Sequence, residues 1–186
     1  VGVAAGAILF IGASFQQVGL IYTTAGKSAF ITCLYIVMVP IAGIFLKQRI
    51  SAATWFGCGL ALSGLYLLCV KESFSIAYGD LLELIGAFFW TAHILWIDRF
   101  SRRVDTLKLA FFQFVACAVL SLAVAFWTET IHWSAVTASA GPLLYGGLAS
   151  VGIAYTLQIV GQKQAPPAHA AIILSMETVF AAIGGY

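Results

Sequence analysis

Charged side chains are scarce in this sequence. Only 9% of its 186 residues are Asp, Glu, Lys or Arg, whereas 62% are hydrophobic. Soluble domains usually carry about 25% charge, so the polar residues here are too few to cover a globular core in water. The hydrophobicity recurs from end to end and is therefore not explained by a signal peptide. The sequence predicts an integral membrane protein with the lipid bilayer as its surroundings.

Motifs that carry chemistry are also missing. The sequence has no HExxH, no GxSxG, no phosphate-binding glycine loop and no Cys or His cluster at metal-ligand spacing. Its cysteines show no CxxC spacing and lie inside apolar segments, which favours buried small side chains: Cys33, Cys58, Cys69 and Cys117. We therefore expect no enzyme activity, no catalytic residue, no metal ion, no cofactor and no nucleic-acid partner.

What the sequence has instead is a series of long apolar segments. A helix that crosses a bilayer needs roughly 20 predominantly apolar residues. Seven segments satisfy this requirement, and the connections between them are too short to hold a soluble domain. The predicted spans are Val1–Tyr22, Ser28–Leu46, Ala52–Val70, Gly79–Ile97, Leu107–Trp127, Pro142–Gln162 and Ala168–Tyr186. Because the chain starts at Val1 and its last span ends without a flanking charge, we expect it to be a piece of a longer protein.

Lysine and arginine alternate between the loops that separate these spans. The second, fourth and sixth loops carry Lys47, Arg49, Arg99, Arg102, Arg103, Lys108 and Lys163. The other loops carry only Lys27 and Lys71. Cytoplasmic loops are enriched in these residues. The alternation therefore predicts a multi-pass protein of the cell (inner) membrane with the even-numbered loops in the cytoplasm.

The stretch Gly19–Leu46 predicts a tight antiparallel hairpin, because the short polar turn Thr23–Lys27 joins two apolar spans. Pro40 lies inside the second of these spans, where proline removes a backbone hydrogen bond and usually kinks a helix. Lipid tolerates this only where a neighbouring helix or a polar cavity satisfies the freed carbonyl. A similar hairpin covers residues 150–186, and its turn is predicted on the opposite side, as in inverted repeats.

Small residues at four-residue spacing predict close contacts between helices. Such pairs are Gly2 with Gly6, and Gly59 with Ser63. The same spacing starts at Gly146 in the sixth span. These pairs are common in any polytopic bundle and indicate packing rather than a particular function.

Three ionisable residues lie inside predicted spans: Glu83, His93 and Glu177. Insertion scales put the cost of a charged group there at about 2.5–3.5 kcal/mol, and such groups usually face a bundle interior or a water-filled cavity. Glu83, Gly86, Trp90 and His93 share one stripe of a helix, as a cavity lining would. The alternatives are a carboxylate at headgroup level for Glu83 and a neutral, hydrogen-bonded histidine for His93. We take as candidate cavity residues Gln17, Tyr35, Glu83, Trp90, His93, Tyr155 and Glu177, with Pro40 as a helix kink.

Several stretches resemble a known family. GLIYTTAGKSAFITCLYIVMVPIAGIFL and TWFGCGLALSGLYLL are similar to the third to fifth helices of an EamA-type carrier of the drug/metabolite transporter superfamily. GDLLELIGAFFWTAHILWIDRFSRR resembles the start of that family's second repeat, and residues 146–186 resemble its eighth and ninth helices. Near Glu177 the sequence reads Met-Glu-Thr-Val, where members often have Glu-Pro-Val.

The resemblance implies an all-α polytopic transmembrane helical bundle, with two inverted repeats of five helices in the intact protein. This chain would cover about seven of the ten helices. Residues 1–70 would be the C-terminal part of the first repeat, and residues 79–186 the N-terminal part of the second.

The function that the resemblance implies is a transporter, an exporter or permease that moves a small metabolite such as an amino acid by alternating access. A proton or a counter-substrate is the candidate energy source. A nucleotide-sugar or phosphate-ester carrier is the main alternative, although such substrates call for cationic residues at membrane depth and no Lys or Arg lies mid-span. A membrane interaction or assembly protein without transport is the alternative from another class.

Overall fold

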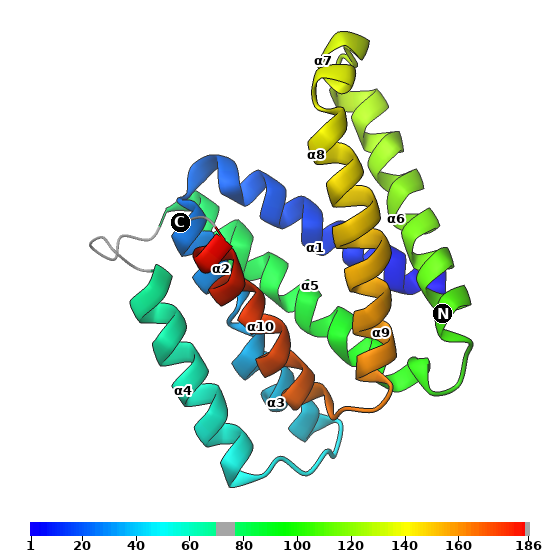
Figure 1. The fold of residues 1–186 in the computed structure, drawn as a ribbon. Coiled ribbons are helices and arrows are strands. Elements are labelled where there is room, and N and C mark those ends of the chain that lie inside the picture. Colours follow the sequence, from blue (N-terminus) through cyan, green and yellow to red (C-terminus); the bar gives the residue numbers. More distant parts are fainter. Residues whose placement is uncertain (70–76, 185–186) are drawn as a thin grey trace. The chain divides into compact units, whose positions relative to one another are not determined.

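The computed structural model describes residues 1–69 and 77–184, and every regular element in that part of the chain is a helix. Figure 1 shows their course. The helices are α1 (Gly2–Tyr22), α2 (Ala25–Thr32), α3 (Tyr35–Phe45), α4 (Ala52–Cys69), α5 (Tyr78–Ser101), α6 (Thr106–Thr128), α7 (Trp133–Ala138), α8 (Ala140–Leu144), the π-helix η1 (Tyr145–Tyr155), α9 (Thr156–Gln162) and α10 (Pro167–Gly184). The predicted all-α class is confirmed. The predicted span end at Val70, the loop residue Lys71 and the terminal Gly185 and Tyr186 lie outside the described residues.

Each of the seven predicted spans coincides with an apolar helical segment. Five helical segments of the described chain are long and apolar enough to cross a membrane: Gly2–Tyr22, Ala25–Phe45, Tyr78–Ser101, Thr106–Thr128 and Ala140–Gln162. Two further apolar helices, Ala52–Leu68 and Pro167–Phe180, are shorter. Helices dominate because a segment in lipid must satisfy its backbone hydrogen bonds internally.

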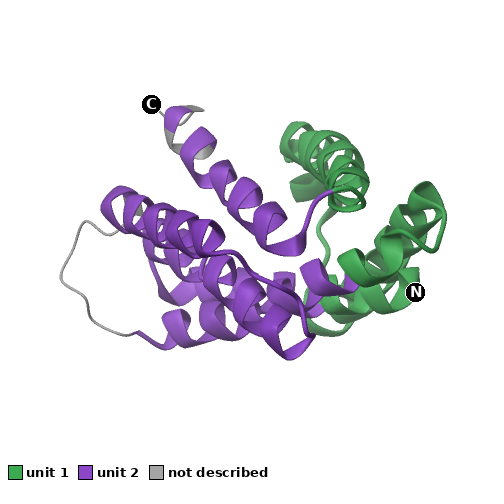
Figure 2. Ribbon diagram, turned by 90° about the horizontal axis from the view of Figure 1, so that it is seen from below, with its two compact units in different colours: residues 1–10, 97–164 green, residues 11–96, 165–186 purple. Residues whose placement is uncertain are grey.

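The chain forms two compact units, coloured separately in Figure 2. Unit 1 holds residues 1–10 and 97–164, and unit 2 holds residues 11–96 and 165–186. In unit 2, α10 packs on α3 and α4, and α4 also packs on α2. The core of this unit is one apolar cluster: Cys33, Tyr35, Ile36, Val39, Cys58, Leu65, Ile94 and Ala171.

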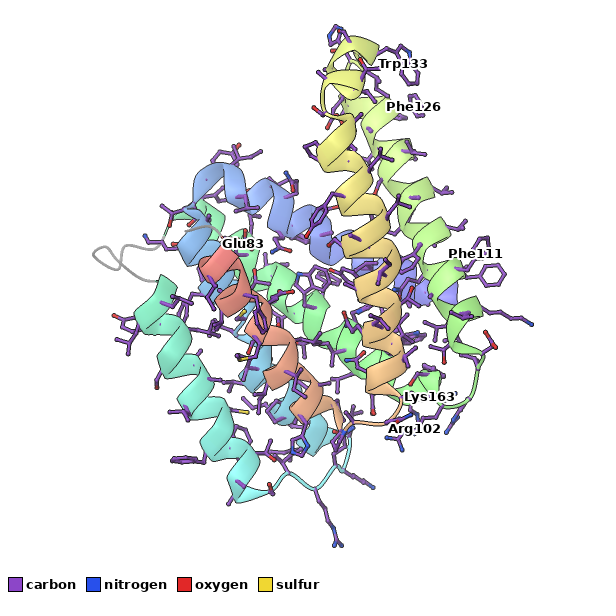
Figure 3. All side chains as sticks on the ribbon, in the orientation of Figure 1. Glu83, Arg102, Phe111, Phe126, Trp133 and Lys163 are labelled. Atoms are coloured by element: carbon purple, nitrogen blue, oxygen red, sulfur yellow. The ribbon has the colours of Figure 1, made fainter. Side chains whose placement is uncertain are left out.

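Unit 1 is built on α6, which packs against α9 and against the start of α1. A Cβ added at Gly6 would lie 2.3 Å from the backbone oxygen of Gln113, so only glycine permits this approach. Many apolar side chains of the unit remain exposed, among them Phe126 at 71% and Trp127 at 91%. Figure 3 shows Phe111 and Phe126 projecting from α6. Apolar surface of this extent suits contact with lipid rather than water.

Two sequence-based expectations need correction. The predicted turn Thr23–Lys27 is too long, because Thr24 caps α2 by accepting a hydrogen bond from the Lys27 backbone N–H at 3.3 Å. The helix therefore begins at Ala25 and contains Lys27. Close contacts were expected at Gly59 and Gly146 as well as at Gly2 and Gly6. The expectation holds for the first turns of α1, but a Cβ at Gly59 or Gly146 would meet no described atom within 4 Å.

Gly79 offers a test of the packing between α1 and α5. A Cβ added there would lie 2.6 Å from the Gly19 backbone oxygen and 2.7 Å from the Tyr22 carbonyl carbon. Backbone atoms cannot rotate away, so we expect Gly79→Ala to lower the free energy of unfolding in detergent micelles by about 2 kcal/mol. Gly59→Ala on α4 is the matched control and should have little effect. Equal stability of the two variants would show that α1 and α5 do not approach this closely.

Candidate functional site

The carboxyl group of Glu83 on α5 is the centre of the polar contacts in unit 2. Its side chain has no exposed surface. The Ser28 hydroxyl donates to Oε1 at 2.7 Å, and the Thr32 hydroxyl donates to Oε2 at 2.9 Å. Both donors belong to α2 and stand one helical turn apart, which puts them on the same face. Both carboxyl oxygens of Glu83 thus accept a hydrogen bond from the same neighbouring helix, α2.

Helix α1 makes room for this carboxyl group through glycine. A Cβ added at Gly19 would lie 2.8 Å from Glu83 Oε1 and 3.0 Å from its Cγ. One helical turn onward along α5, Gly86 lies opposite Gly12 and Phe15 of α1. The stripe predicted as a cavity lining therefore packs against α1, and the absence of side chains at the glycines allows the two helices to approach closely.

A second carboxylate, that of Asp80 on α5, is hydrogen-bonded to the turn of the hairpin formed by α1 and α2. The Thr23 hydroxyl, in the turn between α1 and α2, donates to Asp80 Oδ1. The other oxygen of Asp80 accepts from the Ala77 backbone N–H at 2.8 Å, which satisfies a free donor at the start of α5. The hairpin is thus tied to α5 both at its turn and at Glu83.

The helical span that follows the turn has irregular hydrogen bonding at its middle, and we call it the interrupted span. Helix α2 ends at Thr32 and α3 begins at Tyr35, so Cys33 and Leu34 lie between them. The backbone there makes short-range bonds, from Leu34 N–H to the Ile31 oxygen at 3.0 Å and from Ile36 N–H to the Cys33 oxygen at 2.9 Å. These are turns of the tighter 3₁₀ type, which often mark a hinge or a strained sequence.

Pro40 lies after the interruption, and α3 continues through it. A proline at this position provides no N–H for the carbonyl of Ile36, four residues earlier. That carbonyl accepts instead from the Cys58 thiol of α4 at a sulfur–oxygen distance of 3.4 Å. A neighbouring helix thus satisfies the freed carbonyl, as the sequence required. Cys58 is buried, as expected, but it also acts as a hydrogen-bond donor.

The interruption also contacts α10. The Cys33 thiol and the Thr178 hydroxyl lie 3.4 Å apart and share a hydrogen bond. A proline at position 178 would lack this hydroxyl and could not make the contact. Glu177, the preceding residue, is exposed on the described chain.

The other predicted cavity residues are dispersed. Tyr35 is part of the apolar core at 5% exposure. His93 is fully buried, and its ring lies edge-on to Trp90 on the same helix, with centroids 6.3 Å apart. Gln17 is exposed on α1, and Tyr155 ends η1 in unit 1. Of the predicted residues in unit 2, Glu83, Trp90 and His93 lie together on α5.

Sequence reasoning missed four residues of the site: Thr23, Ser28, Thr32 and Asp80. A signal for them existed. Asp80 and Glu83 are three residues apart, and Ser28 and Thr32 are four apart, so each pair shares a helix face. Two hydroxyls on one face of an apolar span, and two acids on one face of another, form a complementary pattern of donors and acceptors.

Comparison with known proteins supports the family. An "Uncharacterized transporter" of Archaeoglobus fulgidus is 37% identical over 178 residues, which cover 92% of this chain and 55% of that protein. A model of the EamA-like transporter family matches residues 77–186. This chain belongs to the EamA-like transporter family. It is accordingly a multi-pass membrane protein of a transporter family, and the predicted resemblance is confirmed.

A crystal structure supports the fold of this EamA-like protein. It superimposes with a TM-score of 0.78 at 23% sequence identity and covers 96% of this chain and 65% of its own. At that identity the likeness shows the fold alone. The chain spans about half the length of the curated relative that it matches.

Glu83 and Glu177 form a matched pair for a stability test. Glu83→Ala would leave two buried hydroxyls without their acceptor, so we expect it to lower the free energy of unfolding by about 2 kcal/mol. Glu177→Ala removes an exposed side chain and should change it by less than about 0.5 kcal/mol. Unfolding of both variants in detergent micelles measures the difference. If the Glu177 variant proved the less stable, Glu83 would not be the centre of the packing.

Proposed function

We propose that the intact protein is a carrier that moves a small metabolite across the membrane by alternating access. The observation that carries the proposal is a fully buried carboxyl group, Glu83, hydrogen-bonded to an interrupted transmembrane span. Ionisable residues at membrane depth mark substrate or ion pathways, and discontinuous helices form the binding sites of many transporters. Membership of a transporter family supports the same conclusion.

The substrate class we favour is an amino acid or a related compound. No lysine or arginine lies in the middle of a span, which argues against a phosphate ester or a nucleotide sugar. Coupling to a proton or to a counter-substrate supplies the energy in this proposal, and no chemical reaction is catalysed. The candidate cavity residues keep that role in this proposal, and among them Glu83 and His93 are ionisable side chains buried on α5.

The membrane placement is also part of the proposal. We place the even-numbered loops in the cytoplasm of a cell whose inner membrane holds the protein. Support comes from the alternation of lysine and arginine, and from Figure 3, where Arg102 and Lys163 lie toward the same end of unit 1. Residues 1–70 and 79–186 are then parts of two repeats, which agrees with a family match that starts at residue 77.

Transport by the full-length protein in proteoliposomes tests this role. We expect His93→Gln and Glu177→Gln each to change the uptake rate of a radiolabelled amino acid mixture by about tenfold, because single groups that contact a substrate are commonly worth 1–2 kcal/mol. The matched controls are His132→Gln and Glu129→Gln, which change the same residue types in the connection between α6 and α7, outside the predicted spans.

Unchanged rates for both test variants would remove His93 and Glu177 from the mechanism. The absence of any uptake by the wild-type protein, combined with no gain in thermal stability from any amino acid tested, would argue against this substrate class. Binding raises the apparent stability of a folded protein by mass action, so the stability screen detects a substrate even without transport.

A further inference from the structure

The two halves of the interrupted span, α2 and α3, are held by different hydrogen bonds. Helix α2 donates from Ser28 and Thr32 to Glu83 of α5. Helix α3 accepts at the Ile36 carbonyl from Cys58 of α4. Both halves pack on α4, and α3 packs most heavily on α10.

The backbone between the halves mixes two kinds of hydrogen bond. Leu34, Ile36 and Val37 each donate to a carbonyl three residues earlier, at 2.9–3.0 Å, whereas Cys33 and Met38 donate four residues back, at 3.1 Å. Pro40 then removes one further backbone donor from the first turns of α3. A stretch of such 3₁₀ bonds in the middle of a helix often marks a hinge.

We propose that Cys33–Leu34 is a hinge at which α2 moves relative to α3, and that the hydrogen bonds from Ser28 and Thr32 to Glu83 are the latch that holds α2 in place. The motion rests on the proposed carrier function, because alternating access requires part of a span to move while the rest stays packed. Release of the two hydroxyl bonds detaches α2 from Glu83, whereas the preceding turn stays bonded to α5 through Thr23 and Asp80, and α3 keeps its contacts with α4 and α10. The Cys33 thiol, bonded to Thr178, stays with the α3 side.

Amide hydrogen exchange in the full-length protein tests the hinge without any substrate. The double variant Ser28→Ala/Thr32→Val removes both latch donors and retains the shape of the threonine side chain. We expect amide exchange over residues 25–32 to rise about tenfold, whereas exchange over residues 35–45 stays at its wild-type level. Cys58→Ala perturbs the α3 side instead and is the control, in which exchange over residues 25–32 should stay unchanged.

Equal acceleration in both halves, or in neither, would overturn the hinge. If the double variant does not fold, Thr32→Val alone removes one donor. We then expect the same result, faster amide exchange over residues 25–32 than in the wild type and unchanged exchange over residues 35–45. Because exchange is measured without transport, the two proposals can fail separately. If both halves exchange at the same rate in a protein that still transports, the hinge is wrong and the carrier function stands. If the halves exchange independently in a protein that transports nothing, the hinge stands and the carrier function is wrong.

Discussion

A carboxyl group with no exposed surface must find its hydrogen-bond partners within the protein, because neither water nor lipid reaches it. Glu83 meets this constraint with two hydroxyls from α2, and the packing around it follows from that arrangement. Ser28 and Thr32 must share one face of α2, and α1 must carry glycine where it passes the carboxyl group. A larger residue at Gly19 would occupy the volume of the Glu83 side chain. The hairpin and α5 are therefore held by the hydrogen bonds to Glu83, in addition to the bond between Thr23 and Asp80 at the turn.

The same constraint acts on the backbone of the interrupted span. A carbonyl that loses its donor in lipid has to be satisfied by a side chain, and Cys58 does this for Ile36. The proline is accordingly accommodated within α3, and the discontinuity lies at Cys33–Leu34, where contacts from α5, α4 and α10 converge. An irregular segment supported from several sides is the arrangement that membrane proteins use where a helix must break. The irregular segment at Cys33–Leu34 therefore links the packing of unit 2 to the carrier function that we propose.

Much of this protein could be predicted from the sequence because the relevant signals are local or compositional. A scarcity of charge excludes a soluble core, and apolar runs of about 20 residues fix the spans. The need for a partner near Pro40 also follows from local chemistry, since proline lacks an N–H wherever it stands. Residues of the site were harder to predict. Glu83 and His93 were identified by their cost in lipid, but Ser28 and Thr32 were not, because a hydroxyl in an apolar span usually bonds to its own helix backbone.

The sequence by itself determined the all-α class, the seven apolar segments, the family and the presence of costly ionisable groups at membrane depth. Only the tertiary structure decided which donors reach Glu83, that Gly59 and Gly146 meet no atom of the described residues within 4 Å, and that the hydrogen bonding of the second span changes at Cys33–Leu34. No glycine or proline occupies the break, so nothing local predicts it. The irregular segment lies beside a contact between residues far apart in the chain, Cys33 with Thr178, and a pattern along one helix contains no information about its neighbours.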